Sequence, residues 1–110
     1  MYQEKFMQFA FDEAKEGIGQ DDGGPFGAVI VKGLEIISRA HNMVIRTNDP
    51  TAHAEVSAIR KASEVLGTFD LSATEIYSTC EPCPMCLSAI YWGGIKTVYY
   101  SMDRMDAEKL

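Results

Sequence analysis

Pro82-Cys83-Pro84-Met85-Cys86 is the most informative stretch of this chain, and His53-Ala54-Glu55 upstream of it is its counterpart. Together they offer two thiols and one imidazole, which are favoured ligands of Zn²⁺, and one carboxylate, that of Glu55. Three protein ligands leave the fourth position of a tetrahedral zinc site open to water, and the metal lowers the pKa of that water towards ~7. Because Glu55 is free to move the proton of such a water, the two motifs predict a catalytic zinc site. Its expected ligands are His53, Cys83 and Cys86.

The C-x-x-C pair taken alone is compatible with two other interpretations. One is a redox pair, and the other is half of a structural zinc site that a fourth Cys or His closes. The redox interpretation gives no role to His53 and Glu55. The structural one depends on Cys80, which is poorly placed on the far side of Pro82. We therefore expect Cys80 to be a buried free thiol at a strand end, and His41 to be a polar strand-end residue and not a ligand.

Length and composition bound the class of protein. The chain has 110 residues, 46% of them hydrophobic, which suits one domain spanning 1–110. Its net charge is −6 and its ten Lys and Arg residues are spread along the sequence, which disfavours a nucleic-acid partner. Three cysteines, two of them in C-x-x-C, indicate reduced thiols and a cytoplasmic protein. No apolar run is long enough for a membrane span and no secretory pattern opens the chain, so we expect no membrane partner.

Hydrophobic periodicity predicts an α/β fold with part of its sheet parallel. A Gly-rich loop is expected over 17–25, a polar connector over 41–48, and a hairpin between the first two strands. Helices are expected over 2–17, 50–66 and 84–92, and strands over 26–31, 35–40, 75–79 and 96–101.

The expected helix starts bring the two motifs together. Asp49 is a candidate N-cap, and Pro50 suits the first helical position. His53 and Glu55 then lie in the first turn, where residues about 200° apart around the axis still reach a metal beyond the helix end. Cys83 and Cys86 lie likewise at the start of the next helix. Helix N-termini favour anions and lower thiol pKa values, and both helices follow strands, so one ion at the carboxyl edge of the sheet is expected.

Two further residues are candidates for contact with a substrate. Asn42 follows the second strand, and its amide can both donate to and accept from the edge of a base. The alternative for Asn42 is a turn residue in the left-handed conformation. Phe26 is more often a core residue, although glycines on both sides of the Pro25-Phe26 pair suggest close approach of the backbone to a ligand.

Four stretches resemble bacterial guanine deaminases of the cytidine-deaminase-like superfamily. They are Gly24-Pro25-Phe26-Gly27-Ala28-Val29-Ile30-Val31-Lys32, Asn48-Asp49-Pro50-Thr51-Ala52-His53-Ala54-Glu55-Val56, Cys80-Glu81-Pro82-Cys83-Pro84-Met85-Cys86 and Ala89-Ile90-Tyr91-Trp92. H-x-E followed by P-C-x-x-C is itself a known signature of zinc nucleobase deaminases.

The resemblance covers essentially the whole chain and implies a three-layer α/β/α sandwich around a mixed sheet of five strands. It implies deamination of guanine to xanthine and ammonia, with zinc on His53, Cys83 and Cys86 and with Glu55 as the proton shuttle. Base contacts are implied for Asn42, Phe26 and the backbone near Ala54. A small purine base is then the substrate, and the protein is a homodimer.

The resemblance leaves alternatives and includes one departure. tRNA adenosine deaminases share the stretch from Asp49 to Glu55, whereas Phe26, Tyr91-Trp92 and the acidic balance favour the guanine enzymes. A cytosine or cytidine deaminase and a non-catalytic zinc-stabilised binding module are the other candidates. The related enzymes continue into a helical tail, which we expect to be missing here together with the fifth strand. Some of the aromatic residues near the last helix and strand are expected at a subunit interface; the candidates are Tyr91, Trp92, Tyr99 and Tyr100.

Overall fold

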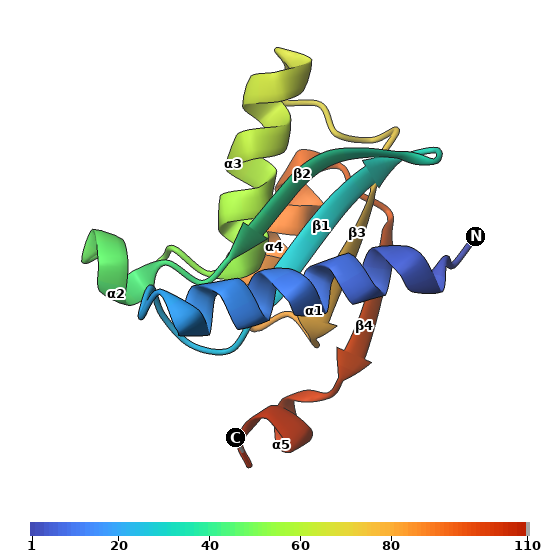
Figure 1. Cartoon of the computed structure of the whole chain (residues 1–110). Coiled ribbons are helices and arrows are strands. Elements are labelled where there is room, and N and C mark those ends of the chain that lie inside the picture. The colour runs from blue at the N-terminus through green and yellow to red at the C-terminus, as the bar shows by residue number, and fades with distance from the viewer. Residues whose placement is uncertain (110) are drawn as a thin grey trace.

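The computed structural model describes residues 1–109 (Figure 1). In chain order its elements are α1 (Glu4–Gly19), β1 (Gly27–Lys32), β2 (Glu35–His41), α2 (Val44–Thr47), α3 (Ala54–Leu66), β3 (Glu75–Cys80), α4 (Pro84–Gly93), β4 (Thr97–Met102) and α5 (Arg104–Ala107).

The strands form one mixed sheet in the order β2-β1-β3-β4. β1 is antiparallel to both of its neighbours, and β3 is parallel to β4. Strands β2, β3 and β4 therefore run in one direction and end at the same edge, where β1 begins. Residues that follow these three strands, or that precede β1, are brought together at this edge even though they are far apart in sequence.

Both faces of the sheet are covered by helices, which confirms the three-layer α/β/α architecture (Figure 1). Side chains alternate along β1, so Val29 and Val31 face α1 with Tyr77 whereas Ala28 and Ile30 face α3 and α4. The strand is buried on both sides, as expected for a central strand of a sandwich. The α1 face is closed by Phe6, Met7 and Ala10, and the opposite face by Ala54, Ala58, Ala62, Leu71, Ile90 and Ile95.

The helices differ from the prediction at two boundaries and by additional short helices. α1 continues to Gly19, and the expected connector contains α2. α3 begins at Ala54 and not at Pro50, because the Asp49 carboxylate accepts hydrogen bonds from the backbone N and the hydroxyl of Thr51 (2.8 and 2.7 Å). Asp49 thus closes a local turn in place of capping the helix.

The outer surface corrects one burial expectation. The helical period of 50–66 predicts Val65 on the core side together with Ala58 and Ala62, but Val65 is 66% exposed. Tyr99 packs against Tyr77 (ring centroids 4.7 Å apart) on the α1 side, whereas Tyr91 and Trp92 are 77% and 82% exposed. The sheet has four strands within 1–109, so the implied fifth strand is not among the described elements. No helix in this range has both the length and the apolar composition needed to cross a membrane.

Candidate metal centre and substrate pocket

His53 and Glu55 lie on either side of the first residue of α3. His53 is the N-cap, with extended backbone, and its side chain makes no capping hydrogen bond within the described part of the chain. Its imidazole is therefore available beyond the helix end. Glu55 is in the first turn, as the sequence predicted, although the helix starts four residues later than expected.

Cys83 and Cys86 occupy the matching place on α4. Cys83 is the N-cap, Pro84 is at the first helical position, and Cys86 is fully buried in the first turn. His53 Nδ1 lies 3.7 Å from Cys83 Sγ and 3.5 Å from Cys86 Sγ. One ligand atom from each of the three residues lies within 4.8 Å of the other two. Two helix N-termini thus converge on one point.

This donor set fits zinc. Nitrogen and sulfur ligands at the usual Zn–N and Zn–S distances, in a tetrahedron, lie about 3.6 Å apart. The distances of 3.5 and 3.7 Å match that spacing. Burial, Glu55 and Cys83 all raise the pKa of the Cys86 thiol, so the surroundings require a bound cation to hold Cys86 as a thiolate. His53 would bind through Nδ1, which the sequence motif alone does not specify.

Glu55 is a buried carboxyl beside this cluster. It is 6% exposed, and burial raises its pKa, while a backbone hydrogen bond and His53 act in the opposite direction. Desolvation favours the neutral form of a carboxyl, so Glu55 binds a proton more readily than an exposed glutamate does, which suits a group that takes up and releases a proton.

A pocket of about 320 Å³ opens onto the cluster. The predicted residues Phe26, Asn42, His53, Ala54, Glu55 and Cys83 all line it, together with Cys80, Glu81, Arg104, Ala107 and Glu108. The pocket therefore lies at the sheet edge where β2, β3 and β4 end and β1 begins. Cys80 is 9% exposed and ends β3, which confirms it as a buried free thiol.

Asn42 has a fixed orientation in this pocket. Its Oδ1 accepts a hydrogen bond from Val44 N (3.0 Å), and a backbone N–H identifies that atom as the oxygen. The amide Nδ2 is then left as a donor. Asp21 and Asn48 are the non-glycine residues in 1–109 with positive φ, so Asn42 is not the left-handed turn residue of the alternative interpretation.

The last elements of the chain provide one wall of the pocket, which the sequence did not predict. Arg104 and Ala107 belong to α5, and Arg104 N donates to Glu81 Oε1 (3.1 Å), which links this wall to the turn after β3. No motif marks these residues, and only the parallel pairing of β3 with β4 brings them to the site. His41 lies outside the three-residue cluster, as expected, and its ring faces Glu13 and Asp22.

Comparisons with known proteins agree with this geometry. A family model described as the cytidine and deoxycytidylate deaminase zinc-binding region matches residues 1–102. Guanine deaminase of Bacillus subtilis (strain 168) is 53% identical over 107 residues, which are 97% of this chain and 69% of that protein. The X-ray structure of guanine deaminase from Bacillus subtilis has a TM-score of 0.95 and covers 99% of this chain and 69% of its own.

Two further relatives broaden the comparison. The tRNA-specific adenosine deaminase of Aquifex aeolicus (strain VF5) is 46% identical over 101 residues, which are 92% of this chain and 66% of that protein. A protein whose crystal structure was solved in complex with 2,6-diaminopurine is 30% identical, with a TM-score of 0.88. The match covers 94% of this chain and 58% of the chain in that structure. With a family model that covers nearly all of its length, a mixed sheet between helices and a converging His, Cys, Cys cluster, the chain belongs to the cytidine and deoxycytidylate deaminase family with a zinc-binding region.

Proposed function

We propose that this protein catalyses the hydrolytic deamination of guanine to xanthine, with release of ammonia. The observation that carries the proposal is the convergence of His53, Cys83 and Cys86 beside the buried carboxyl of Glu55, at the base of a pocket that Asn42 and Phe26 also line. The 53% identity with a protein named guanine deaminase supports guanine as the substrate.

In this proposal the chain supplies three metal ligands and one proton carrier. Zinc held by His53 Nδ1, Cys83 Sγ and Cys86 Sγ would supply Lewis acidity that lowers the pKa of a water molecule. Glu55 takes a proton from the attacking water, passes it to the ring nitrogen, and returns a proton to the leaving amine. A carbon–oxygen bond forms, the exocyclic carbon–nitrogen bond breaks, and ammonia leaves, so guanine and water become xanthine and ammonia.

Asn42, Phe26 and Ala54 hold the base in the same proposal. Asn42 donates from Nδ2, Phe26 offers an apolar ring, and backbone groups near Ala54 add polar contacts. All three line the pocket next to Glu55, which supports the assignment. A structure that contains 2,6-diaminopurine, a purine, also has this fold.

Deamination of adenosine in tRNA is the second candidate, because the Aquifex aeolicus tRNA-specific enzyme is 46% identical. The net charge of −6 disfavours binding of tRNA, which is a polyanion. An assay of ammonia release from guanine, adenine, cytosine, cytidine and tRNA separates the candidates. We expect release from guanine. Release only from tRNA, cytosine or cytidine would contradict the proposal, and release from none would favour a zinc-stabilised binding module.

We also propose that the protein is a homodimer that uses the exposed face of α4. Leu87, Tyr91 and Trp92 are 54%, 77% and 82% exposed, and large exposed apolar patches commonly mark interfaces. Sedimentation of a Trp92→Ser variant tests this. We expect a shift towards monomer, and no shift for the control Phe69→Ser, whose side chain is 89% exposed at another site. A wild-type monomer would contradict the homodimer.

Three free cysteines support a cytoplasmic location.

A further inference from the structure

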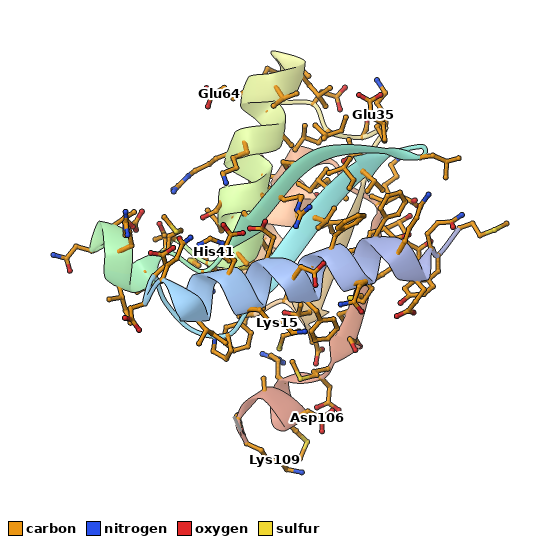
Figure 2. All side chains as sticks on the ribbon, in the orientation of Figure 1. Lys15, Glu35, His41, Glu64, Asp106 and Lys109 are labelled. Atoms are coloured by element: carbon orange, nitrogen blue, oxygen red, sulfur yellow. The ribbon has the colours of Figure 1, made fainter. Side chains whose placement is uncertain are left out.

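His41 ends β2 directly before Asn42, and its ring lies between two carboxylates. Its Nδ1 is 3.0 Å from Glu13 Oε1, and its Nε2 is 2.7 Å from Asp22 Oδ2. Glu13 and Asp22 are only 8% and 1% exposed. Figure 2 shows His41 at the side of the molecule where β2 approaches α1 and α2.

Two arginines pair with these buried carboxylates from the surface, with side chains that are 35% (Arg39) and 62% (Arg46) exposed. Arg39 Nε is 3.2 Å from Glu13 Oε2, and Arg46 Nη1 is 3.3 Å from Asp22 Oδ1. Carboxylates removed from water are retained only when they are paired, so this network specifies how its elements meet. None of these residues belongs to the three metal ligands or to the wall of the substrate pocket.

Asp22 is the centre of the network, because its backbone groups and its side chain all have partners. Asp22 N donates to Gly17 O at the end of α1 (3.0 Å), and Asp22 O accepts from Arg46 N in α2 (2.9 Å). Asp22 thus joins α1, the Gly-rich loop, β2 and α2 at one point.

Two residues that lie against the Asn42 amide, Gly23 and Val44, are connected to Asp22. Gly23 follows Asp22, and a Cβ on Gly23 would lie 2.2 Å from Asn42 Oδ1, so the loop backbone lies directly against the amide. On the other side Val44, the first residue of α2, donates to Asn42 Oδ1 (3.0 Å), and Asp22 binds Arg46 of the same short helix. The amide can rotate or shift only if the loop or α2 moves.

We propose that His41 and Asp22 are positioning residues that hold the Asn42 amide with Nδ2 directed towards the substrate. The inference rests on the proposed function, because it assigns Asn42 to contact with the base. Val44 occupies the amide oxygen, so the held amide presents a donor. The site then favours a ring edge with a carbonyl oxygen or an unprotonated nitrogen at that point over one with an amino group.

A double-mutant cycle tests whether the pair acts through Asn42. We expect Asp22→Asn and His41→Gln to keep zinc but to lower kcat/KM for guanine by about 10- to 10²-fold, mainly through KM, because small displacements of positioning groups have effects of this size. In an Asn42→Ala background the same changes should add less than about twofold. Glu35→Gln, at the exposed first residue of β2 and far along the strand from His41, is the matched control and should behave as wild type. Full additivity in the cycle would overturn the proposal.

Hydrogen exchange supplies a readout that does not depend on turnover. The Val44 amide is bound to Asn42 Oδ1, so its exchange should be faster in zinc-loaded Asp22→Asn and His41→Gln than in wild type and Glu35→Gln, with α3 unchanged. Unchanged Val44 exchange, or equal acceleration in α3, would overturn the proposal. If wild type does not deaminate guanine but the Val44 result holds, the proposed function fails and the positioning of Asn42 stands.

Discussion

At the scale of single residues, Glu55 differs from the other acidic side chains near the pocket. Glu81 and Glu108 are partly or fully exposed, whereas Glu55 is buried, and burial is the largest cause of its raised pKa. No Lys or Arg within 1–109 forms a salt bridge with it. A buried carboxyl without a cationic side chain is costly to keep for packing alone, which favours a chemical role.

Glu55→Gln tests that role directly. The amide keeps the size of the side chain and removes its ability to carry a proton, so we expect normal zinc content, normal melting temperature and a kcat lowered by about 10²- to 10⁴-fold. Glu64→Gln is the matched control, since Glu64 is an exposed residue near the far end of the same helix (Figure 2). Turnover close to wild type in zinc-loaded Glu55→Gln would remove Glu55 from the mechanism.

At the scale of elements, α3 and α4 each begin with a candidate metal ligand where a capping residue normally stands. Neither His53 nor Cys83 makes a side-chain capping hydrogen bond in the described structure. A shared ion would link the two helix starts, in addition to their direct packing. Zinc binding should therefore stabilise the fold as well as support chemistry.

The cysteines allow that expectation to be tested with a close control. Cys83→Ala should lose most bound zinc by elemental analysis and should melt at a lower temperature that a chelator no longer changes. Cys80→Ala removes a thiol from the same pocket but no ligand, so it should keep about one zinc per chain and the response to the chelator. Equal zinc content in the two variants would contradict the ligand assignment.

α1 packs on β1 at a distance that only glycine allows. A Cβ on Gly27 would lie 2.0 Å from the carbonyl oxygen of Ala10, whereas a Cβ on Gly19 would meet nothing within 4 Å. We expect Gly27→Ala to lower the free energy of unfolding by at least the ~1–3 kcal/mol typical of overpacking, and Gly19→Ala to change it little. Urea unfolding measures both. Equal stability of the two variants would show that α1 can move away at little cost.

Elements with strong local signals were predicted from sequence, and elements fixed by distant partners were not. β1, β2, β3, α4 and β4 match their expected ranges within two residues at each end, because their apolar patterns and turn residues are local. The start of α3 was wrong because Asp49 has two possible local partners and bonds Thr51. The burial of Glu13 in α1 was not predicted, because its partners His41 and Arg39 come from the distant strand β2.

At the scale of the whole molecule, the strand order of the sheet decides which residues form the site. It also decides which of these residues could be predicted from sequence. The two motifs predicted that His53, Cys83 and Cys86 come together beside Glu55, since each motif carries its own helix start. The pocket wall of Arg104 and Ala107 follows only from the placement of β4 beside β3, which no local pattern in 97–107 reveals. The sequence therefore predicts the residues at the chemical centre of the site but not those of the outer pocket wall.

On the α1 face of the sheet, an aromatic cluster joins the N-terminus to the strands. Tyr2, Phe6 and Tyr99 pack around Tyr77, whose hydroxyl accepts from Gln3 N (2.9 Å). Burial raises the pKa of Tyr77 and of Tyr99, and a hydrogen bond with Glu4 raises the pKa of Tyr2 to about 12. These tyrosines thus keep their protons in the folded protein at pH values where free tyrosine, with a pKa of about 10, begins to lose them.

This difference predicts a loss of stability at alkaline pH. Above about pH 10 the unfolded chain binds fewer protons than the folded one, so the free energy of unfolding falls as pH rises, while below pH 10 the contribution is fully present. Urea unfolding between pH 8 and 11.5 should show a shallower decline for Tyr99→Phe than for wild type. Tyr91→Phe, at an exposed position outside the cluster, should decline as wild type does. The same slope in all three proteins would mean that other groups, and not the aromatic cluster, set the alkaline limit of this fold.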